Sequence, residues 1–165
     1  MKIKFFLYVN NYHGGPQIRI WNADKLLVDQ TLSKKGPQTI ELETELNLPT
    51  ALTVEHHGKN MKYDTKILDG EIVDDKGFTI EKIQIDKFTL HNEIHNFKFY
   101  DDKGSVIEKT NYIGYNGKFV IDIDAKHLSI WYYTLKKKLL QETESFDYKQ
   151  FKEDIFEGQP SEVSY

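Results

Sequence analysis

The chain has 165 residues, with 22 basic and 26 acidic side chains, a formal net charge of −4 and no cysteine. Its length fits one domain with its own core, and the absence of cysteine excludes disulfides and thiolate metal sites. Arg19 is the one arginine, so neither the forked arginine contacts nor the basic surface that nucleic-acid binding favours is expected.

The N-terminal segment 2–9, KIKFFLYV, alternates apolar and other residues. This period of two predicts a strand with Ile3, Phe5 and Leu7 on its buried face. Its apolar run is shorter than a secretory signal requires, and no later segment is long enough to span a bilayer. We therefore expect a protein that is not secreted by a signal peptide and has no membrane partner.

The next segments predict an antiparallel sheet built from short strands. Residues 17–21 and 26–32 flank the turn sequence NADK and predict a hairpin. Residues 39–43 and 51–57 alternate in the same way, and turns rich in Gly, Pro and Asn separate all four segments. Short strands separated by such turns are typical of sandwiches and barrels.

A nonapeptide occurs twice, as DDKGFTIEK at 74–82 and DDKGSVIEK at 101–109, with seven of nine positions identical. Aspartate can accept bonds from backbone N–H groups in a turn, and glycine adopts a positive φ at little cost. Because each copy lies between strand-like segments, we predict that both are hairpin turns of one meander. The alternative is a binding site built twice.

Further strands are predicted at 116–124, with Phe119 and Ile121 buried, and at 127–135. Breaks in the alternation between Ile80 and Ile83, and between Ile85 and Phe88, predict two β-bulges.

Residues 145–160 instead show helical spacing of their apolar residues, followed by a Gly and Pro stop. The predicted architecture is an all-β antiparallel sandwich, jelly-roll-like, over residues 1–140, with a short C-terminal helix and tail over 141–165.

Catalytic motifs are not found in the sequence. The segment HNEIH at 91–95 matches neither order of the zinc-protease signature, and in an extended chain its histidines would be too far apart to share an ion. His56 and His57 are adjacent, so a strand would direct them to opposite faces. We therefore predict that the protein is not an enzyme. A glycosidase pair of carboxylates stays open as an alternative, because such pairs form in space.

The acidic loops are the strongest candidate for an ion site. Four aspartates fall within twelve residues: Asp64, Asp69, Asp74 and Asp75. Calcium prefers hard oxygen ligands from short loops, although the spacing here is not that of an EF-hand. We predict these four as candidate calcium ligands, with turn formation as the alternative.

Exposed aromatic residues are the second candidate. Alternation places Phe6 and Tyr8 on the outer face of the first strand, and Trp131 and Tyr133 on the outer face of the strand predicted at 127–135. A flat aromatic face can hold a sugar ring. The same side chains could equally form a protein interface or a second layer of the core.

The segments DTKILDGEIVDDKGFTIEKIQID (64–86) and YIGYNGKFVIDI (112–123) carry a resemblance. Their turn residues and alternating isoleucines resemble uncharacterised β-rich proteins of tailed bacteriophages. Those proteins are in turn similar to calcium-dependent carbohydrate-binding modules with a jelly-roll sandwich. The resemblance implies the same fold and a structural or glycan-binding role.

From these observations we predict a non-enzymatic structural or adhesive component of a phage virion, on the capsid, neck or tail. It would be located in the virion, or in the host cytoplasm before assembly. The expected partners are other virion proteins or further copies of the chain, with surface glycans as an additional ligand and no cofactor other than calcium. One alternative is a soluble calcium-dependent carbohydrate-binding module. The other is an intracellular phage protein that inhibits a host enzyme.

Overall fold

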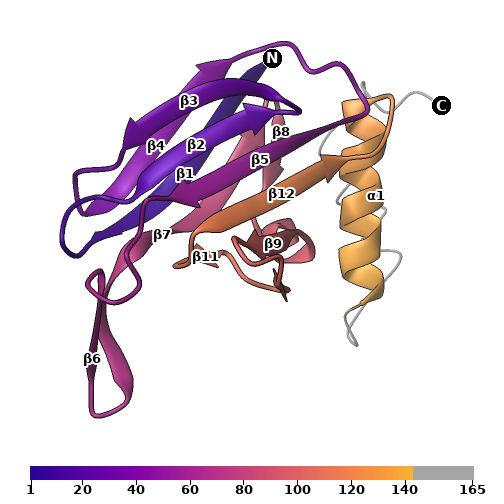
Figure 1. The fold of residues 1–165 in the computed structure, drawn as a ribbon. Coiled ribbons are helices and arrows are strands. Elements are labelled where there is room, and N and C mark those ends of the chain that lie inside the picture. The colour runs from indigo at the N-terminus through magenta and orange to yellow at the C-terminus, as the bar shows by residue number, and fades with distance from the viewer. Residues whose placement is uncertain (143–165) are drawn as a thin grey trace.

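The computed structural model describes residues 1–142, which form two antiparallel sheets packed face to face (Figure 1). The first sheet has the order β11 (Tyr112–Ile113), β7 (Glu71–Ile85), β1 (Lys2–Asn11), β4 (Gly36–Glu43), and β6 (Thr65–Leu68) and β8 (Phe88–Leu90) also pair with β7. The second has the order β10 (Val106–Ile107), β9 (Lys98–Asp101), β12 (Gly117–Ile123), β5 (Thr50–His57), β2 (Gln17–Asn22), β3 (Lys25–Thr31).

The core lies between the sheets and follows the alternation of the strands. On β1, every second residue from Ile3 to Val9 is at most 1% exposed, and Phe119, Ile121 and Ile123 of β12 are fully buried. Side chains of a strand alternate between its faces, so one apolar set fills the core and the other faces outward. The predicted fold class, an antiparallel β-sandwich with a short helix, is confirmed.

The hairpin predicted around NADK is also confirmed. β2 pairs with β3, and the two-residue turn between them places Ala23 at a φ of 52°. Positive φ at this position is the geometry that lets a two-residue turn match the twist of its strands.

The two copies of the nonapeptide adopt different structures, so the prediction of two hairpin turns is half wrong. The second copy forms the turn between β9 and β10, where Asp101 Oδ1 accepts the N–H groups of Lys103 at 3.0 Å and Ser105 at 2.7 Å. The first copy lies inside β7, a continuous strand of 15 residues. The turn that precedes β7 is at Asp69 and Gly70, whose φ angles are 52° and 80°.

The glycine shared by the two copies of the nonapeptide is required for a different reason in each copy. Gly104 has a φ of 84° in the turn and open space around its Cα. Gly77 instead lies where a Cβ would be 2.7 Å from the Ile113 carbonyl oxygen and 2.8 Å from the Tyr112 hydroxyl. Glycine inside a strand often marks such a close approach, and here it lets β11 lie against β7.

One of the two predicted bulges is confirmed. The pairing of β1 with β7 shifts between Phe6 and Leu7, so that Glu81 is the extra residue of β7. The second break in the alternation is a turn: Asp86 and Lys87 connect β7 to β8, which pair directly.

The strand predicted at 127–135 is wrong, because these residues begin helix α1 (Leu128–Gln141). Leu128 and Trp131 lie one turn apart and are buried, whereas Ile130 is 57% exposed. Figure 1 shows α1 beside the end of β12. No helix in the range 1–142 has the length and apolar character needed to cross a membrane. The helix predicted at 145–160 lies outside the described residues, and the division at residue 140 stays a prediction.

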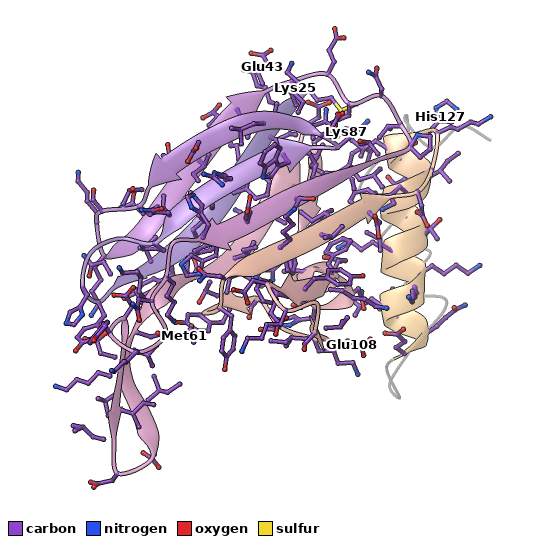
Figure 2. All side chains as sticks on the ribbon, viewed as in Figure 1. Lys25, Glu43, Met61, Lys87, Glu108 and His127 are labelled. Atoms are coloured by element: carbon purple, nitrogen blue, oxygen red, sulfur yellow. The ribbon has the colours of Figure 1, made fainter. Side chains whose placement is uncertain are left out.

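A β-hairpin formed by β6 and the start of β7 projects from the body of the sandwich (Figure 1). Its side chains extend away from both sheets, as Figure 2 shows below Met61. Four of its apolar side chains are more than half exposed: Ile67, Leu68, Ile72 and Val73. The hairpin therefore takes little stability from core burial and depends on the contacts at its root.

Candidate functional site

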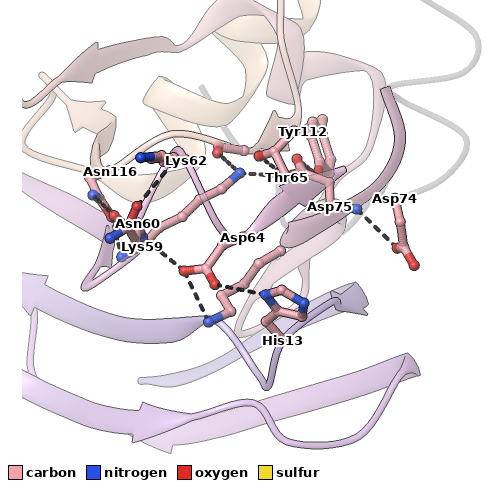
Figure 3. Close-up of polar contacts among 12 residues, drawn as sticks. His13, Lys59, Asn60, Lys62, Asp64, Thr65, Asp74, Asp75, Tyr112 and Asn116 are labelled. Carbon is pink, nitrogen blue, oxygen red and sulfur yellow. Dashed lines mark hydrogen bonds and ion pairs between the residues drawn. The ribbon is translucent and has the colours of Figure 1, made fainter. Parts of the chain in front are cut away.

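Two of the predicted calcium ligands, Asp64 and Asp75, lie at the root of this hairpin, and both are buried (Figure 3). The ammonium group of Lys59 lies 2.5 Å from Asp75 Oδ1, and Thr65 Oγ1 donates to the same oxygen at 2.7 Å. The Tyr112 hydroxyl donates to the other oxygen. Lys59 also donates to the Gly114 carbonyl, and its side chain is 1% exposed. Asp75 is thus the centre of a closed polar network.

Asp64 is held in a similar way. It accepts the backbone N–H of Asn60 at 2.8 Å, and Lys76 Nζ lies 3.1 Å from the same carboxylate. Asp74 accepts the N–H of Asp75 at 2.9 Å, and Asp69 lies in the turn at the hairpin tip.

The electrostatics of the root follow from its two lysines. Burial alone would raise the pKa of Asp75, but hydrogen bonds from Lys59 and Tyr112 outweigh it and lower that pKa. Burial likewise opposes ionisation of Asp64, and the bonds from Asn60 and Lys76 lower its pKa. Burial and the neighbouring Asp75 carboxylate raise the pKa of Tyr112. The root therefore consists of ionised carboxylates paired with ammonium groups.

This arrangement does not fit a calcium ion. Calcium needs six to eight oxygen ligands around one centre, whereas the oxygens of Asp64 and Asp75 surround two ammonium groups. Asp69 lies apart from both, at the hairpin tip. Within residues 1–142, no three histidine, aspartate or glutamate side chains are arranged to hold a metal ion. Asp64 and Asp75 instead fix the hairpin to the sandwich through their paired lysines.

The predicted aromatic residues separate into two places. Phe6 and Tyr8 do lie on the outer face of the first sheet, on β1, as the alternation predicted. Lys82 Nζ covers the Phe6 ring at 4.1 Å from its centroid, and Tyr8 is 39% exposed between Pro37 and Thr79.

Trp131 and Tyr133 are not on an exposed strand face, because they lie on α1. Trp131 is 2% exposed, stacks on Phe97 with 6.2 Å between ring centroids, and donates to the Asp122 carbonyl at 2.8 Å. Tyr133 is half-buried and lies edge-on to Phe88. Trp131 is therefore a core residue that attaches α1 to the sandwich, with its ring already stacked on Phe97.

The HNEIH segment is not extended, as the sequence had suggested, but contains a short 3-10 helix, Asn92–Asn96. Its Glu93 is 2% exposed and lies 2.6 Å from Lys136 of α1. Burial opposes ionisation of Glu93, but the bonds from Lys136 and the His91 N–H lower its pKa. The segment therefore serves as the second attachment point of α1.

A cleft of about 550 Å³ lies on the outer face of the second sheet, at the ends of β5, β9 and β12. Outward-facing residues of the three strands, Glu55, Tyr100 and Lys118, form one wall. The turn 101–104 and the loop at Asn116 and Gly117 form the other. We name this space the sheet cleft.

The wall of the sheet cleft is one row of neighbouring side chains across the sheet. Tyr100 lies opposite Lys118, and Lys118 opposite Glu55, which lies opposite Arg19. Trp21 Nε1 donates to Glu55 Oε2 at 2.8 Å. Tyr100 is 38% exposed, so its ring is available to a ligand while its neighbours supply polar groups.

His56 lines the inner end of the cleft and is 1% exposed. Burial, together with the nearby charge of Lys59, lowers its pKa to about 4. The imidazole is therefore neutral at neutral pH.

Asn116 connects the sheet cleft to the hairpin root. Its side-chain oxygen accepts the Lys59 N–H at 2.9 Å, and its amide donates to the Lys59 carbonyl at 2.8 Å. This clamp fixes the loop that forms one cleft wall. The loop and the root are 57 residues apart in the chain, so no local pattern in the sequence could have indicated the contact.

No motif in the sequence predicts the sheet cleft. The sequence predicts Asp101 and Asp102 only as turn residues of the repeated nonapeptide. Tyr100 directly precedes them at an outward position of the strand 98–101. An exposed tyrosine next to an acidic turn was the one local signal that could have indicated the site.

Comparisons with known proteins find similar solved structures and no similar sequence. No family model matches the chain, and no curated protein matches it. One similar structure is vCBM60 in complex with galactobiose, with a TM-score of 0.50, 13% identity, and coverage of 74% of this chain and 98% of that one.

A second structure of vCBM60 has a TM-score of 0.52 at 13% identity, over 77% of this chain and 95% of that one. It is described in connection with a circular permutation linking two families of calcium-dependent carbohydrate-binding modules. At this identity the likeness shows the fold: the chain is an antiparallel sandwich similar to that of a carbohydrate-binding module.

Proposed function

We propose that this protein is a non-enzymatic glycan-binding module whose ligand lies in the sheet cleft. The observation that carries the proposal is the partly exposed Tyr100 ring in a 550 Å³ cleft with polar walls. Ligand sites are commonly concave, with aromatic contact area and a few placed polar groups. The likeness to a module that was solved with galactobiose supports the same class of ligand.

The chemistry of the cleft suits a sugar. A pyranose ring has an apolar C–H face and hydroxyl groups around its edge, so it can pack on the Tyr100 ring while its hydroxyls meet polar walls. Asp102 and His57 can accept hydrogen bonds from sugar hydroxyl groups, and Lys118 can donate hydrogen bonds to sugar oxygens. Trp21 and Glu55 hold one another by their hydrogen bond, which keeps the wall in place before a ligand arrives.

We propose that the bound glycan is not hydrolysed. A glycosidase needs two carboxylates free to act on the bond between two sugars. In the cleft, Glu55 already accepts a hydrogen bond from the Trp21 indole N–H, and Asp101 accepts hydrogen bonds from two backbone N–H groups of its own turn. Two of the three carboxylates that line the cleft are thus engaged in structural hydrogen bonds, and Asp102 alone cannot supply the pair, so a bound oligosaccharide should be recovered unchanged.

Binding should be independent of calcium at Asp64, Asp69, Asp74 and Asp75, because lysines neutralise the two buried carboxylates. We expect the melting temperature to be the same in millimolar CaCl₂ and in EDTA. A rise with CaCl₂ that EDTA reverses would show that these carboxylates, or others, accept the ion.

Two tyrosines provide a matched test of the site, since Tyr100 and Tyr8 are 38% and 39% exposed on opposite sheets. The wild-type protein is first screened on an array of plant, bacterial and animal glycans. For the selected sugar, Tyr100→Ala should weaken binding in calorimetry by about tenfold or more, the worth of one lost ring contact. Tyr8→Ala should bind like wild type. Absence of any binding, or equal loss in both variants, would contradict the proposal.

The proposal retains the glycan binding that was predicted for a virion protein. That the protein is located in a phage virion stays a prediction. Mass spectrometry of purified phage particles tests it directly. A protein that inhibits a host enzyme would instead be absent from particles and would form a stable complex in host lysate.

A further inference from the structure

We infer that the sheet cleft continues as a groove to α1, and that the ligand is a neutral, linear oligosaccharide bound along its length. This inference rests on the proposed function and adds the ligand's shape and charge. A second cavity, of about 260 Å³, lies between α1 and the outer face of the second sheet. It is lined by Asp122 of β12 and by Thr134 and Lys138 of α1, among others, and it shares Tyr100 with the sheet cleft.

The two cavities lie over consecutive rows of one sheet face. Tyr100 and Lys118 are opposite one another in β9 and β12, and the next outward pair is Lys98 and Val120. The first pair lines the sheet cleft, and Lys98 and Val120 line the second cavity. Outward side chains recur every second residue of a strand. The wall formed by the outer face of the sheet therefore continues from one cavity to the other at Tyr100.

The groove is longer than a single sugar ring needs. β12 has seven residues, which span roughly 20 Å of extended chain, and the two cavities follow it from Gly117 to Asp124. Tyr100 lies between the two cavities, and each cavity has polar side chains of its own. Such a site fits the interior of a chain of sugars better than one terminal ring.

The charges along the groove point to a neutral ligand. Acidic residues occur at both ends, as Asp102 in the sheet cleft and Asp122 in the second cavity. Lysines line the same cavities, with Lys118 in the sheet cleft and Lys98 and Lys138 in the second cavity. A strongly anionic or cationic polymer would therefore meet like charges in both cavities, whereas hydroxyl groups can bond with either kind of side chain.

The test uses a pair of variants on α1 that add the same charge. Thr134 lines the second cavity, so Thr134→Arg should fill it. Ile130 lines neither cavity and is 57% exposed on the same helix, so Ile130→Arg is the control. Each variant and the wild type are titrated by calorimetry with galacto-, gluco-, xylo- and manno-oligosaccharides, each series running from disaccharide to hexasaccharide.

For wild type and Ile130→Arg we expect affinity for one series to rise at least tenfold with chain length before it levels off. In Thr134→Arg the longer members should lose that gain, while the disaccharide binds as in wild type. Affinity that does not change with length, or that Thr134→Arg leaves unchanged, would overturn the groove but not the proposed function. If the disaccharide and all longer members fail to bind, and the array is also negative, the proposed function itself fails.

Discussion

At the scale of single residues, the network around Lys59 shows how charge replaces core burial at the hairpin root. The ammonium group is 1% exposed and is satisfied by Asp75 and the Gly114 carbonyl. A buried ion pair adds little net stability over an apolar pair, but removing one partner leaves the other charge uncompensated. The cost of losing either partner should therefore be large.

The first prediction concerns Lys59→Met. We expect it to lower the free energy of unfolding by about 3–5 kcal/mol, since Asp75 would remain buried without its counter-charge. Lys59→Met/Asp75→Asn should recover part of the loss. Urea denaturation measures both, with Lys62→Met, at an exposed lysine, as the control. A loss no greater than that of the control would show that the pair does not support the fold.

The second prediction concerns pH. His56 has a pKa of about 4 in the folded protein, lowered from 6.5 by burial. Between these values the unfolded chain binds more protons, so stability rises with pH across that window, by about 3 kcal/mol in total. The lowered pKa values of Asp75 and Glu93 act at more acid pH, where their protonation removes further stability.

Denaturation from pH 4 to pH 7 in wild type and His56→Leu measures this effect. In the variant the slope between pH 4 and 6.5 should flatten, because the titrating group is gone. A slope that persists unchanged would assign the pH dependence to other groups.

At the scale of elements, the repeated nonapeptide shows that one sequence can meet two structural needs. The third prediction uses its glycines. Gly104→Ala should cost about 1–2 kcal/mol, the strain of a positive φ for alanine. Gly77→Ala should cost more, because its Cβ would lie 2.7 Å from the backbone oxygen of Ile113 and β11 would have to move.

Thermal unfolding of the two glycine variants decides between the two readings of the repeat. Equal losses would mean that both copies act as turns, as the sequence predicted. A greater loss for Gly77→Ala supports the strand assignment.

Most strands could be predicted because their alternation is local: Ile3, Phe5 and Leu7 indicate a buried face without knowledge of their partners. The helix α1 could not, because Leu128 and Ile130 fit an alternating pattern as well as Leu128 and Trp131 fit a helical one. What decided between them is tertiary: Trp131 packs on Phe97, and Lys136 reaches the buried Glu93. Neither contact is visible in a local pattern.

At the scale of the whole molecule, the sheet cleft is a product of topology. Glu55, Tyr100 and Lys118 come from three strands that are neighbours in space in the order β9, β12, β5. Sequence spacing carries no information about such an order. The predicted ligands Asp64 and Asp75 were indeed brought together in one region, but with lysines between their carboxylates, which residue type and spacing alone did not reveal.

The proposed function places a glycan on the outer face of the second sheet of this sandwich. The most direct measurement is an NMR titration of the isotope-labelled protein with the oligosaccharide that the array selects, followed through backbone amide shifts. We expect saturable shifts in β5, β9, β12 and the turn 101–104, with β1 and β4 unchanged. Shifts confined to β1 and β4, or none at saturating sugar, would contradict it.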